Sequence, residues 1–442
     1  MSVAALPDLS RLRRLLIIRL SSIGDVTHAL PVSAALGEAF PNLQISWVVE
    51  EMSAEVVAGN PYLHEVIVVP RERWKRARLS PCVWREYLDF LVGLRRRRFD
   101  VTLDLQGYAK SGMMALAAGA PYRFGGWRLR EGAQLVSRLL PPRFESAHRV
   151  ERFLDVARAL GANPDCIRFP FAIPDSARAH AEALLCAGGL SPESPFAVLN
   201  PATGNQVRRW GAARYAHLAG LLAEAFQLPC VLIGSEKDVA LCEEIRARAQ
   251  PARLESGGIP APLNLAGQTG LKELAALLER CAVQISGDTG SAHIAAALGR
   301  PVVALFGPTD PAHAGPWNQS GNVLCHRELC APGCGAQRCA RPQAGPVDEA
   351  GKTGYNKTGN REQGTGNREG PRTVPKVQGT MATRSDRREA PFHRGVGKAR
   401  GKREERNETR LGESRGRVVT ARCLAAISPE EVCQKVGQVL HG

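Results

Sequence analysis

Two glycine-bearing turns carry the acid and hydroxyl side chains with which this chain could act on an anionic ligand. One is residues 286–290, of sequence SGDTG, between an apolar run that ends at Ser286 and a helical pattern from Ile294 to Gly299. The first backbone N–H groups of a helix have no partner within it and lie at the positive end of its dipole. A turn of this kind suits phosphate, so we expect an anion site here.

The second turn is residues 21–25, SSIGD, which follows the apolar run 15–20. A nearly continuous apolar run is typical of a parallel strand covered on both faces, and the turn at its carboxyl end is where α/β sheets bind ligands. We therefore expect Asp25 in a crevice. As an alternative, Asp25 is the N-cap of the following helix, a common position for an aspartate. The wide separation of the two turns favours two similar domains that face each other.

The elements around these turns alternate between strand and helix, which predicts an α/β fold. We expect an N-terminal domain over 1–175, a C-terminal domain over 176–341, a low-complexity insert over 342–418 and a helix completing the fold over 419–442. The expected strands are 15–20, 45–49, 66–69, 101–105, 196–200, 230–234, 283–286 and 302–306. The expected helices are 29–39, 150–160, 177–186, 212–224, 239–249, 271–280 and, at the end of the chain, 429–440 after the N-cap Ser428.

Length and composition fit such a fold. The 442 residues suffice for two domains, and no stretch reaches the roughly 20 apolar residues of a membrane span. The first residues lack the basic and long apolar regions of a signal peptide, so we expect a cytoplasmic protein.

The formal net charge of +15 is unevenly spread, because residues 342–418 hold 18 Lys or Arg and 10 Asp or Glu. This segment is poor in aliphatic residues and repeats TGNRE at 358–362 and 365–369, so we expect it to be disordered. It is either a tether to an anionic surface or nucleic acid, or an insertion without a role. We favour the second and expect no nucleic-acid partner, because the charges are mixed in sign and aromatic residues are sparse.

Four of the twelve cysteines fall where a metal could bring them together. They are Cys330, Cys334, Cys339 and Cys423, and their spacing is not the usual CxxC pair. A four-thiolate zinc site and incidental free thiols both remain open.

Three motifs in order carry a family resemblance: SSIGDV at 21–26, DLQGYAKS at 104–111 and SGDTGSAH at 286–293. With them the chain resembles the ADP-heptose:lipopolysaccharide heptosyltransferases over about 15–339 and again from 423. The resemblance implies two facing Rossmann-like domains of the GT-B type, with the acceptor on the N-terminal domain and the nucleotide sugar on the C-terminal one. It further implies inverting transfer of heptose from ADP-heptose to Kdo-lipid A, without a metal or a cofactor.

The resemblance assigns roles to individual residues. Asp25 matches the catalytic base, which takes the proton of the acceptor hydroxyl. The residues that match the donor site are Thr203, Arg208, Glu236, Asp288, Thr289, Gly290 and His293. Arg208 stands where the family usually has lysine, and arginine holds phosphate with a different geometry. As alternatives, Thr203 caps a turn, Glu236 is a solvated turn charge and His293 is an ordinary helix residue.

An acceptor with carboxylates and phosphates needs cations, and a basic cluster surrounds Trp74. The residues that we expect to bind the acceptor are Arg73, Lys75, Arg76 and Lys110. As an alternative, the cluster is a solvated face. A basic N-terminal domain would also hold the protein at the anionic inner leaflet of the inner membrane, on its cytoplasmic face.

The sequence also bears on three other functions. The chain could be a heptosyltransferase II-like or other family glycosyltransferase, with a different ADP-sugar or acceptor. It could also bind nucleotide sugars or nucleic acid without catalysis, but a pure binding module has no need of Asp25. A dehydrogenase is excluded because residues 21–25 replace the GxGxxG motif after the first strand.

Overall fold

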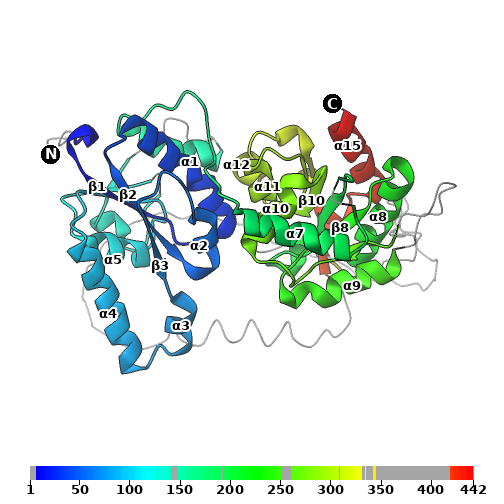
Figure 1. The fold of residues 1–442 in the computed structure, drawn as a ribbon, viewed down its shortest axis with the longest axis horizontal. Coiled ribbons are helices and arrows are strands. Elements are labelled where there is room, and N and C mark those ends of the chain that lie inside the picture. Colours follow the sequence, from blue (N-terminus) through cyan, green and yellow to red (C-terminus); the bar gives the residue numbers. More distant parts are fainter. Residues whose placement is uncertain are drawn as a thin grey trace, which may run out of the picture. The chain divides into compact units, whose positions relative to one another are not determined.

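The computed structural model describes residues 6–126, 128–140, 148–191, 193–249, 260–307, 309–330, 334, 342–344 and 419–441. These residues form two six-stranded parallel sheets with helices on both faces (Figure 1). The expected α/β class with two Rossmann-like halves is confirmed. Within the described residues, no helix combines the length and apolarity that crossing a bilayer requires.

The first sheet has the strand order β3-β2-β1-β4-β5-β6. Alternate residues of β1 enter opposite cores: Leu15 and Ile17 pack with α1 and α6, whereas Leu16 and Ile18 pack with α4 and α5. Its strands are β1 (Arg14–Ile18), β2 (Gln44–Glu50), β3 (Glu65–Val69), β4 (Val101–Asp104), β5 (Tyr122–Gly125) and β6 (Arg138–Leu139). Its helices are α1 (Ile23–Ala39), α2 (Glu51–Val57), α3 (Arg71–Arg76), α4 (Pro81–Arg96), α5 (Ala109–Ala118) and α6 (Arg149–Ala159).

The second sheet repeats this topology, with the order β12-β11-β10-β7-β8-β9. In each sheet the strand order reverses beside the first strand, and ligands bind at such a switch point. The strands are β7 (Ala197–Asn200), β8 (Cys230–Leu232), β9 (Leu263–Asn264), β10 (Val283–Gly287), β11 (Val302–Phe306) and β12 (Val323–Cys325). The helices are α7 (Asp175–Ala187), α8 (Ala212–Phe226), α9 (Val239–Arg248), α10 (Leu271–Arg280), α11 (Gly290–Ala297) and α12 (Pro311–Ala314).

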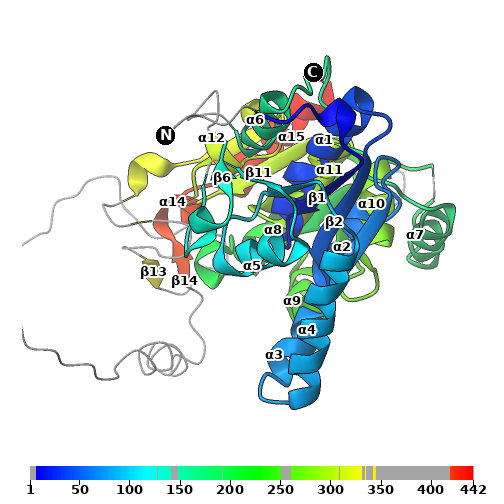
Figure 2. The same ribbon diagram turned by 90° about the vertical axis from the view of Figure 1, so that its left-hand side faces the viewer.

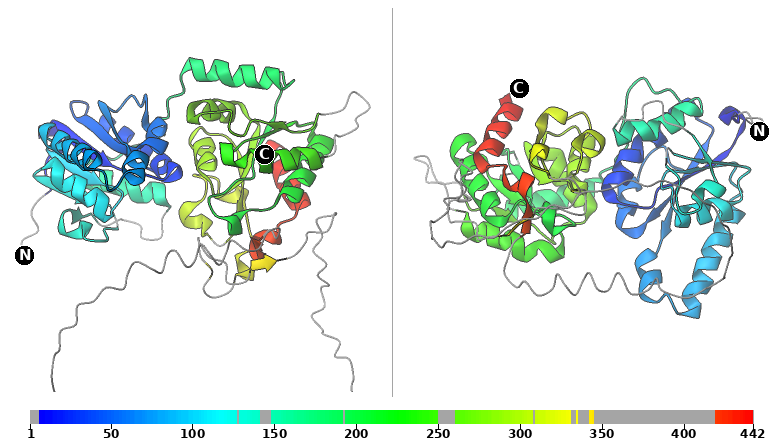
Figure 3. Two further views of the ribbon diagram at one scale, coloured as in Figure 1. Left: turned by 90° about the horizontal axis from the view of Figure 1, so that it is seen from below. Right: turned by 180° about the vertical axis from the view of Figure 1, so that it is seen from behind.

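The C-terminal segment packs into a core of the second sheet's domain (Figure 3). Helices α14 (Arg422–Ala425) and α15 (Pro429–His441) pack beside α8, and the indole N–H of Trp210 donates to the carbonyl of Ile427 at 2.9 Å. Ser428 accepts from the backbone N–H of Glu431, as expected of the N-cap. These contacts make the last helix part of the second core.

Most of the expected insert lies outside the described residues. Its first three residues were assigned wrongly, because β13 (Pro342–Ala344) pairs antiparallel with β14 (Val419–Ala421). This two-stranded ribbon pairs the described residues that precede and follow residues 346–417. The four domain boundaries otherwise stay predictions.

Two helices begin earlier than the apolar pattern suggested. Helix α1 starts at Ile23 rather than Ala29, and α11 starts at Gly290 rather than Ile294. The first turn of α11 consists of small and polar residues, which carry no amphipathic signal, and the first turn of α1 holds the glycine and acid that are typical of a loop. The consequence is that both chemically interesting turns merge directly into helix N-termini.

Candidate active site

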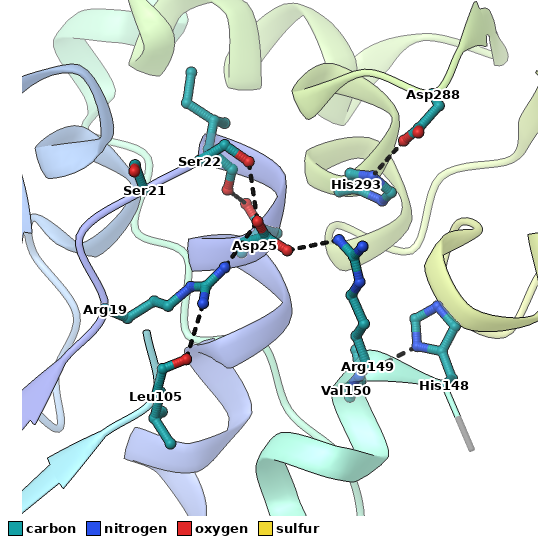
Figure 4. A network of polar contacts seen from close by, with 12 residues as sticks. Arg19, Ser21, Ser22, Asp25, Leu105, His148, Arg149, Val150, Asp288 and His293 are labelled. Carbon is teal, nitrogen blue, oxygen red and sulfur yellow. Dashed lines mark hydrogen bonds and ion pairs between the residues drawn. The ribbon is translucent and has the colours of Figure 1, made fainter. Parts of the chain in front are cut away.

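Asp25 lies in the first turn of α1, directly after β1 (Figure 4). One carboxylate oxygen is 2.7 Å from a guanidinium nitrogen of Arg19, and the other is 2.7 Å from one of Arg149. The hydroxyl of Ser22 donates to the same carboxylate at 3.2 Å. The alternative that Asp25 is the N-cap is wrong, because Ser22 occupies that position. The carboxylate of Asp25 therefore does not cap helix α1.

The two arginines decide the charge of Asp25. Burial alone would raise the pKa of this carboxyl, but the charges of Arg19 and Arg149 outweigh burial and hold the pKa below its usual value. Asp25 is thus an anion at neutral pH and a weak base as long as both ion pairs are intact.

Arg19 and Arg149 are themselves fixed. Arg19 is buried, donates to the carbonyl of Leu105 at 2.8 Å and lies 5.3 Å above the ring centre of Phe153. Arg149 is the first residue of α6, whose N-cap is His148. The Nδ1 of His148 accepts from a backbone N–H of α6, so its Nε2 carries the proton and donates to the carbonyl of Gly315 at 2.8 Å. Burial lowers the pKa of His148 to about 4, which keeps the ring neutral near pH 7.

A cleft of about 440 Å³ opens beside Asp25. Among the described residues that line it, Asp25 is the one carboxylate and several are arginines, so the cleft suits an anionic ligand. The arginines are Arg19, Arg128, Arg130, Arg149 and Arg152. Sequence reasoning assigned none of these five arginines to the site, because they are spread over several segments rather than clustered in one run.

The motif 104–111 holds this arginine loop in place. Buried Asp104 accepts from the backbone N–H groups of Gln106 and Gly107, at 3.0 and 2.8 Å, and from the hydroxyl of Ser111 at 2.9 Å. Gly107 has a φ of +75°, and a Cβ there would collide with the Arg128 carbonyl. The backbone N–H of Arg130 donates to the carbonyl of Gly107 at 2.8 Å. The motif thus explains how Arg128 and Arg130 reach the cleft.

The four cations predicted to bind the acceptor lie elsewhere. Arg73, Lys75 and Arg76 are on α3, and Lys110, at the start of α5, forms an ion pair with Glu50 at 2.7 Å. None of them is among the residues that line the cleft beside Asp25. Their role in acceptor binding stays a prediction.

The predicted donor residues follow strands of the second sheet. Asp288 follows β10, and its carboxylate lies 3.0 Å from the guanidinium of Arg208 and 3.6 Å from the ring Nε2 of His293. Thr289 is the N-cap of α11, and Gly290 is its first residue. The structure therefore brings together Arg208, Asp288, His293 and the N-terminus of α11.

Two other predicted donor residues have different surroundings. The hydroxyl of Thr203, after β7, donates to the carbonyl of Asn205 at 2.7 Å, which is the behaviour of a turn residue. Glu236 is exposed in the short 3₁₀ helix after β8. Both still lie at the carboxyl edge of the second sheet, and neither role is decided by these contacts.

Helices α1 and α11 bring the two sets of residues next to each other (Figure 4). Gly24 of α1 faces His293, and a Cβ on Gly290 of α11 would be 2.8 Å from Ile23. The rings of His28 and His293 pack edge to face, 4.2 Å apart. His293 is close enough to contribute to the low pKa of Asp25. The base candidate and the donor motif thus belong to one site.

The zinc hypothesis receives no support from the part of the chain that the structure describes. There, no group of three or more His, Cys, Asp or Glu side chains is arranged to hold a metal. Cys330, Cys334 and Cys423 are described and form no disulfide, whereas Cys339 lies outside the described residues.

Comparison with known proteins agrees with this geometry. The chain is 30% identical over 216 residues to lipopolysaccharide heptosyltransferase 1 of Escherichia coli O18:K1:H7, which covers 48% of this chain and 64% of that protein. The chain therefore spans just under two thirds of the length of that relative. It is also 30% identical to lipopolysaccharide heptosyltransferase 1 of Pseudomonas aeruginosa over 60% of this chain and 76% of that protein.

Solved structures show the same fold. The Escherichia coli heptosyltransferase WaaC with ADP has a TM-score of 0.57 at 27% identity, covering 70% of this chain and 92% of that one. Escherichia coli heptosyltransferase II has a TM-score of 0.56 at 26% identity, covering 73% and 92%. The model of glycosyltransferase family 9 (heptosyltransferase) matches residues 88–343, more than half of the chain. The chain therefore belongs to glycosyltransferase family 9.

Proposed function

We propose that this protein transfers a heptose from ADP-heptose to the Kdo residue of a Kdo-lipid A acceptor, with inversion and without a metal or a cofactor. The observation that carries the proposal is the carboxylate of Asp25 in the wall of an arginine-lined cleft, next to the donor motif of α11. Relatives named lipopolysaccharide heptosyltransferase 1 and a relative determined with ADP support the choice of donor and acceptor.

In this reaction the acceptor hydroxyl attacks the anomeric carbon of the heptose while the bond from that carbon to the ADP oxygen breaks. Asp25 takes the proton of the attacking hydroxyl, and ADP leaves with the electron pair of the broken bond. The positive end of α11 and the guanidinium of Arg208 stabilise the charge that develops on the diphosphate. Arg208 must then exchange its contact with Asp288 for the phosphate.

The low pKa of Asp25 fits a late proton transfer. A sugar hydroxyl loses its proton readily only once its oxygen has begun to bond to the anomeric carbon, so a weak base suffices at that stage. The carboxylate of the acceptor also competes with Asp25 for Arg149, which lines the same cleft and is 41% exposed. When Arg149 turns to the acceptor, the pKa of Asp25 rises and the base becomes stronger.

Transfer by the wild type and by Asp25→Asn tests the proposal. The amide has the shape of the carboxylate but cannot take a proton, so we expect ADP release to fall by a factor of 10² or more while ADP binding persists. The assay contains a chelator, which leaves the rate unchanged if no metal takes part. Equal rates for the wild type and the variant would refute Asp25 as the base.

The similarity to heptosyltransferase II supports a second candidate, transfer to an acceptor that already carries one heptose. Kdo-lipid A and heptosyl-Kdo-lipid A, offered separately, distinguish the two functions. Turnover of the second acceptor alone would favour the heptosyltransferase II activity. If ADP binds and neither acceptor reacts, the enzyme uses a different ADP-sugar or a different acceptor.

A further inference from the structure

Helices α3 and α4 lie side by side beyond β3, at the edge of the first sheet (Figure 2). They are held together by Trp74 of α3, whose ring packs edge to face against Tyr87 and Phe90 at 5.2 and 5.5 Å. Although α4 has 16 residues, only Val83 and Leu94 are fully buried. Much of its surface therefore faces solvent.

The exposed surface of α4 is apolar along one row. Trp84, Leu88 and Val92 follow each other at intervals of four residues, and their exposed fractions are 58%, 57% and 46%. Arg95 belongs to the same row and reaches Gly119 at the end of α5, which places that end of α5 beside the row. The neighbouring helix α5 adds two apolar side chains that are about half exposed, Met113 and Leu116. We call these five apolar residues the apolar patch.

A strong positive charge surrounds the apolar patch. Residues 71–98 contain ten Lys or Arg and three Asp or Glu. Of these three acids, Glu86 and Asp89 are already paired with Arg73 and Arg85. Within the part of the chain that the structure describes, Lys75, Arg76 and Arg78 are exposed and form no ion pair. A helix with a tryptophan-bearing apolar row next to unpaired cations has the chemistry of a membrane-surface element.

We propose that the apolar patch and the cations of α3 dock this protein on an anionic lipid bilayer. Trp84 and Leu88 enter the headgroup region, and Lys75, Arg76 and Arg78 contact lipid phosphates. Charge complementarity selects this partner. A second copy of the chain would bring the same excess of positive charge to the same surface and would be repelled.

The position of the patch agrees with a lipid-linked substrate, and in this respect the inference rests on the proposed function. Glu50 joins Arg71 of α3 at 3.0 Å and Lys110 of α5 at 2.7 Å. Tyr108, two residues before Lys110, lines the cleft beside Asp25. The docking surface thus adjoins the cleft, so an acceptor embedded in the bilayer could present its sugar to the enzyme without leaving the membrane.

Sedimentation with vesicles tests the proposal on the full chain, without any glycosyl acceptor present. We expect binding to phosphatidylcholine vesicles that contain 30% phosphatidylglycerol, and at least tenfold weaker binding to pure phosphatidylcholine. The variant Lys75→Gln/Arg76→Gln/Arg78→Gln should bind roughly 100-fold more weakly, because each cation near such a surface contributes about 1 kcal/mol. Trp84→Ser/Leu88→Ser should lose at least tenfold. The control Met52→Ser, at a 72% exposed residue on α2, should bind as the wild type does.

Equal vesicle binding by all variants would overturn the proposal. So would a dimer of the wild type in light scattering that Trp84→Ser/Leu88→Ser dissociates, because the patch would then be a subunit interface. Transfer to a deacylated, water-soluble acceptor separates this question from the proposed function. Trp84→Ser/Leu88→Ser should retain that activity and lose only the advantage of an acceptor in vesicles. If the wild type has no transfer activity but binds anionic vesicles, the proposed function fails and the docking surface stands.

Discussion

The close approach of α1 and α11 makes Gly24 the most informative position to change. A Cβ on Gly24 would overlap the ring of His293 and lie 3.2 Å from its Nε2. That ring is 7% exposed and already packs against His28, so it cannot turn away into solvent. Gly24→Ala should therefore push the first turn of α11 away from Asp25.

Two opposing terms set the effect on stability. Overpacking of a buried contact costs about 1–3 kcal/mol, and replacing glycine by alanine inside a helix returns about 0.5–1 kcal/mol. We expect a net loss of roughly 1–2 kcal/mol from these two terms. The effect on catalysis should be larger, because a shift of about 1 Å between a base and the reacting atoms lowers the rate about 10²-fold.

Thermal unfolding and the rate of ADP release, measured well below the unfolding temperature, check both values. The matched control is Gly220→Ala in the interior of α8, where no atom lies within 4 Å of the added Cβ. It should leave the rate unchanged and raise stability by about 0.5–1 kcal/mol. If Gly24→Ala unfolds and reacts like the wild type, the contact between α1 and α11 does not constrain the site and the reasoning is refuted.

Four further predictions follow from the contacts of the site and of the C-terminal ribbon. Arg149→Gln should raise the pKa of Asp25 by about 1 unit, since a hydrogen bond to a charged group contributes about 1.5–3 kcal/mol, and the acid limb of kcat/KM against pH should move up accordingly. Arg208→Ala should weaken ADP binding at least tenfold in calorimetry, and Arg208→Lys should restore most of it. As the pH falls from about 6.5 to about 4, the protein loses stability because the unfolded state takes up the proton of His148 first. His148→Asn should make this loss smaller, and urea titrations at several pH values measure the stability of both proteins. Deletion of 346–417 should leave a cooperative melt, whereas removal of that segment and everything after it should cost several kcal/mol through lost burial in the second core.

The order of strands and helices was largely predictable from the sequence. Buried parallel strands such as β1 and β11 appear as uninterrupted apolar runs, and amphipathic helices such as α10 have a clear period. The short strands β5, β6, β9 and β12 were not predicted, because runs of two to four residues give little pattern and pairing with a neighbouring strand defines them. Helices α2, α4 and α5 were not among the expected elements either. The start of α11 was missed because its first turn is small and polar, and the start of α1 was missed because Gly24 and Asp25 were interpreted as part of the preceding turn.

The parts of the site that lie in local sequence motifs were predictable. Asp25 and the turn before α11 were recognised because glycine, hydroxyl and acid residues between a strand and a helix are a local signal. The arginines of the cleft were not, since Arg19 lies just after β1, Arg130 lies on a loop and Arg149 lies at the start of a helix. They form a site only because the fold brings these segments together, and no local sequence pattern predicts that arrangement.

Sequence alone thus determined the α/β class, the two strand-to-helix turns and the residue types available in them, because these depend on neighbours within a few positions. The tertiary structure decided three other properties. It paired Asp25 with Arg19 and Arg149, which sets the charge and basicity of the carboxylate. It brought α11 against α1 through Gly24, and it left the apolar row of α4 uncovered. Most of these contacts join segments far apart in the chain, such as Arg149 with Asp25 and α11 with α1. Their free energy depends on the folded arrangement, which the local sequence does not specify.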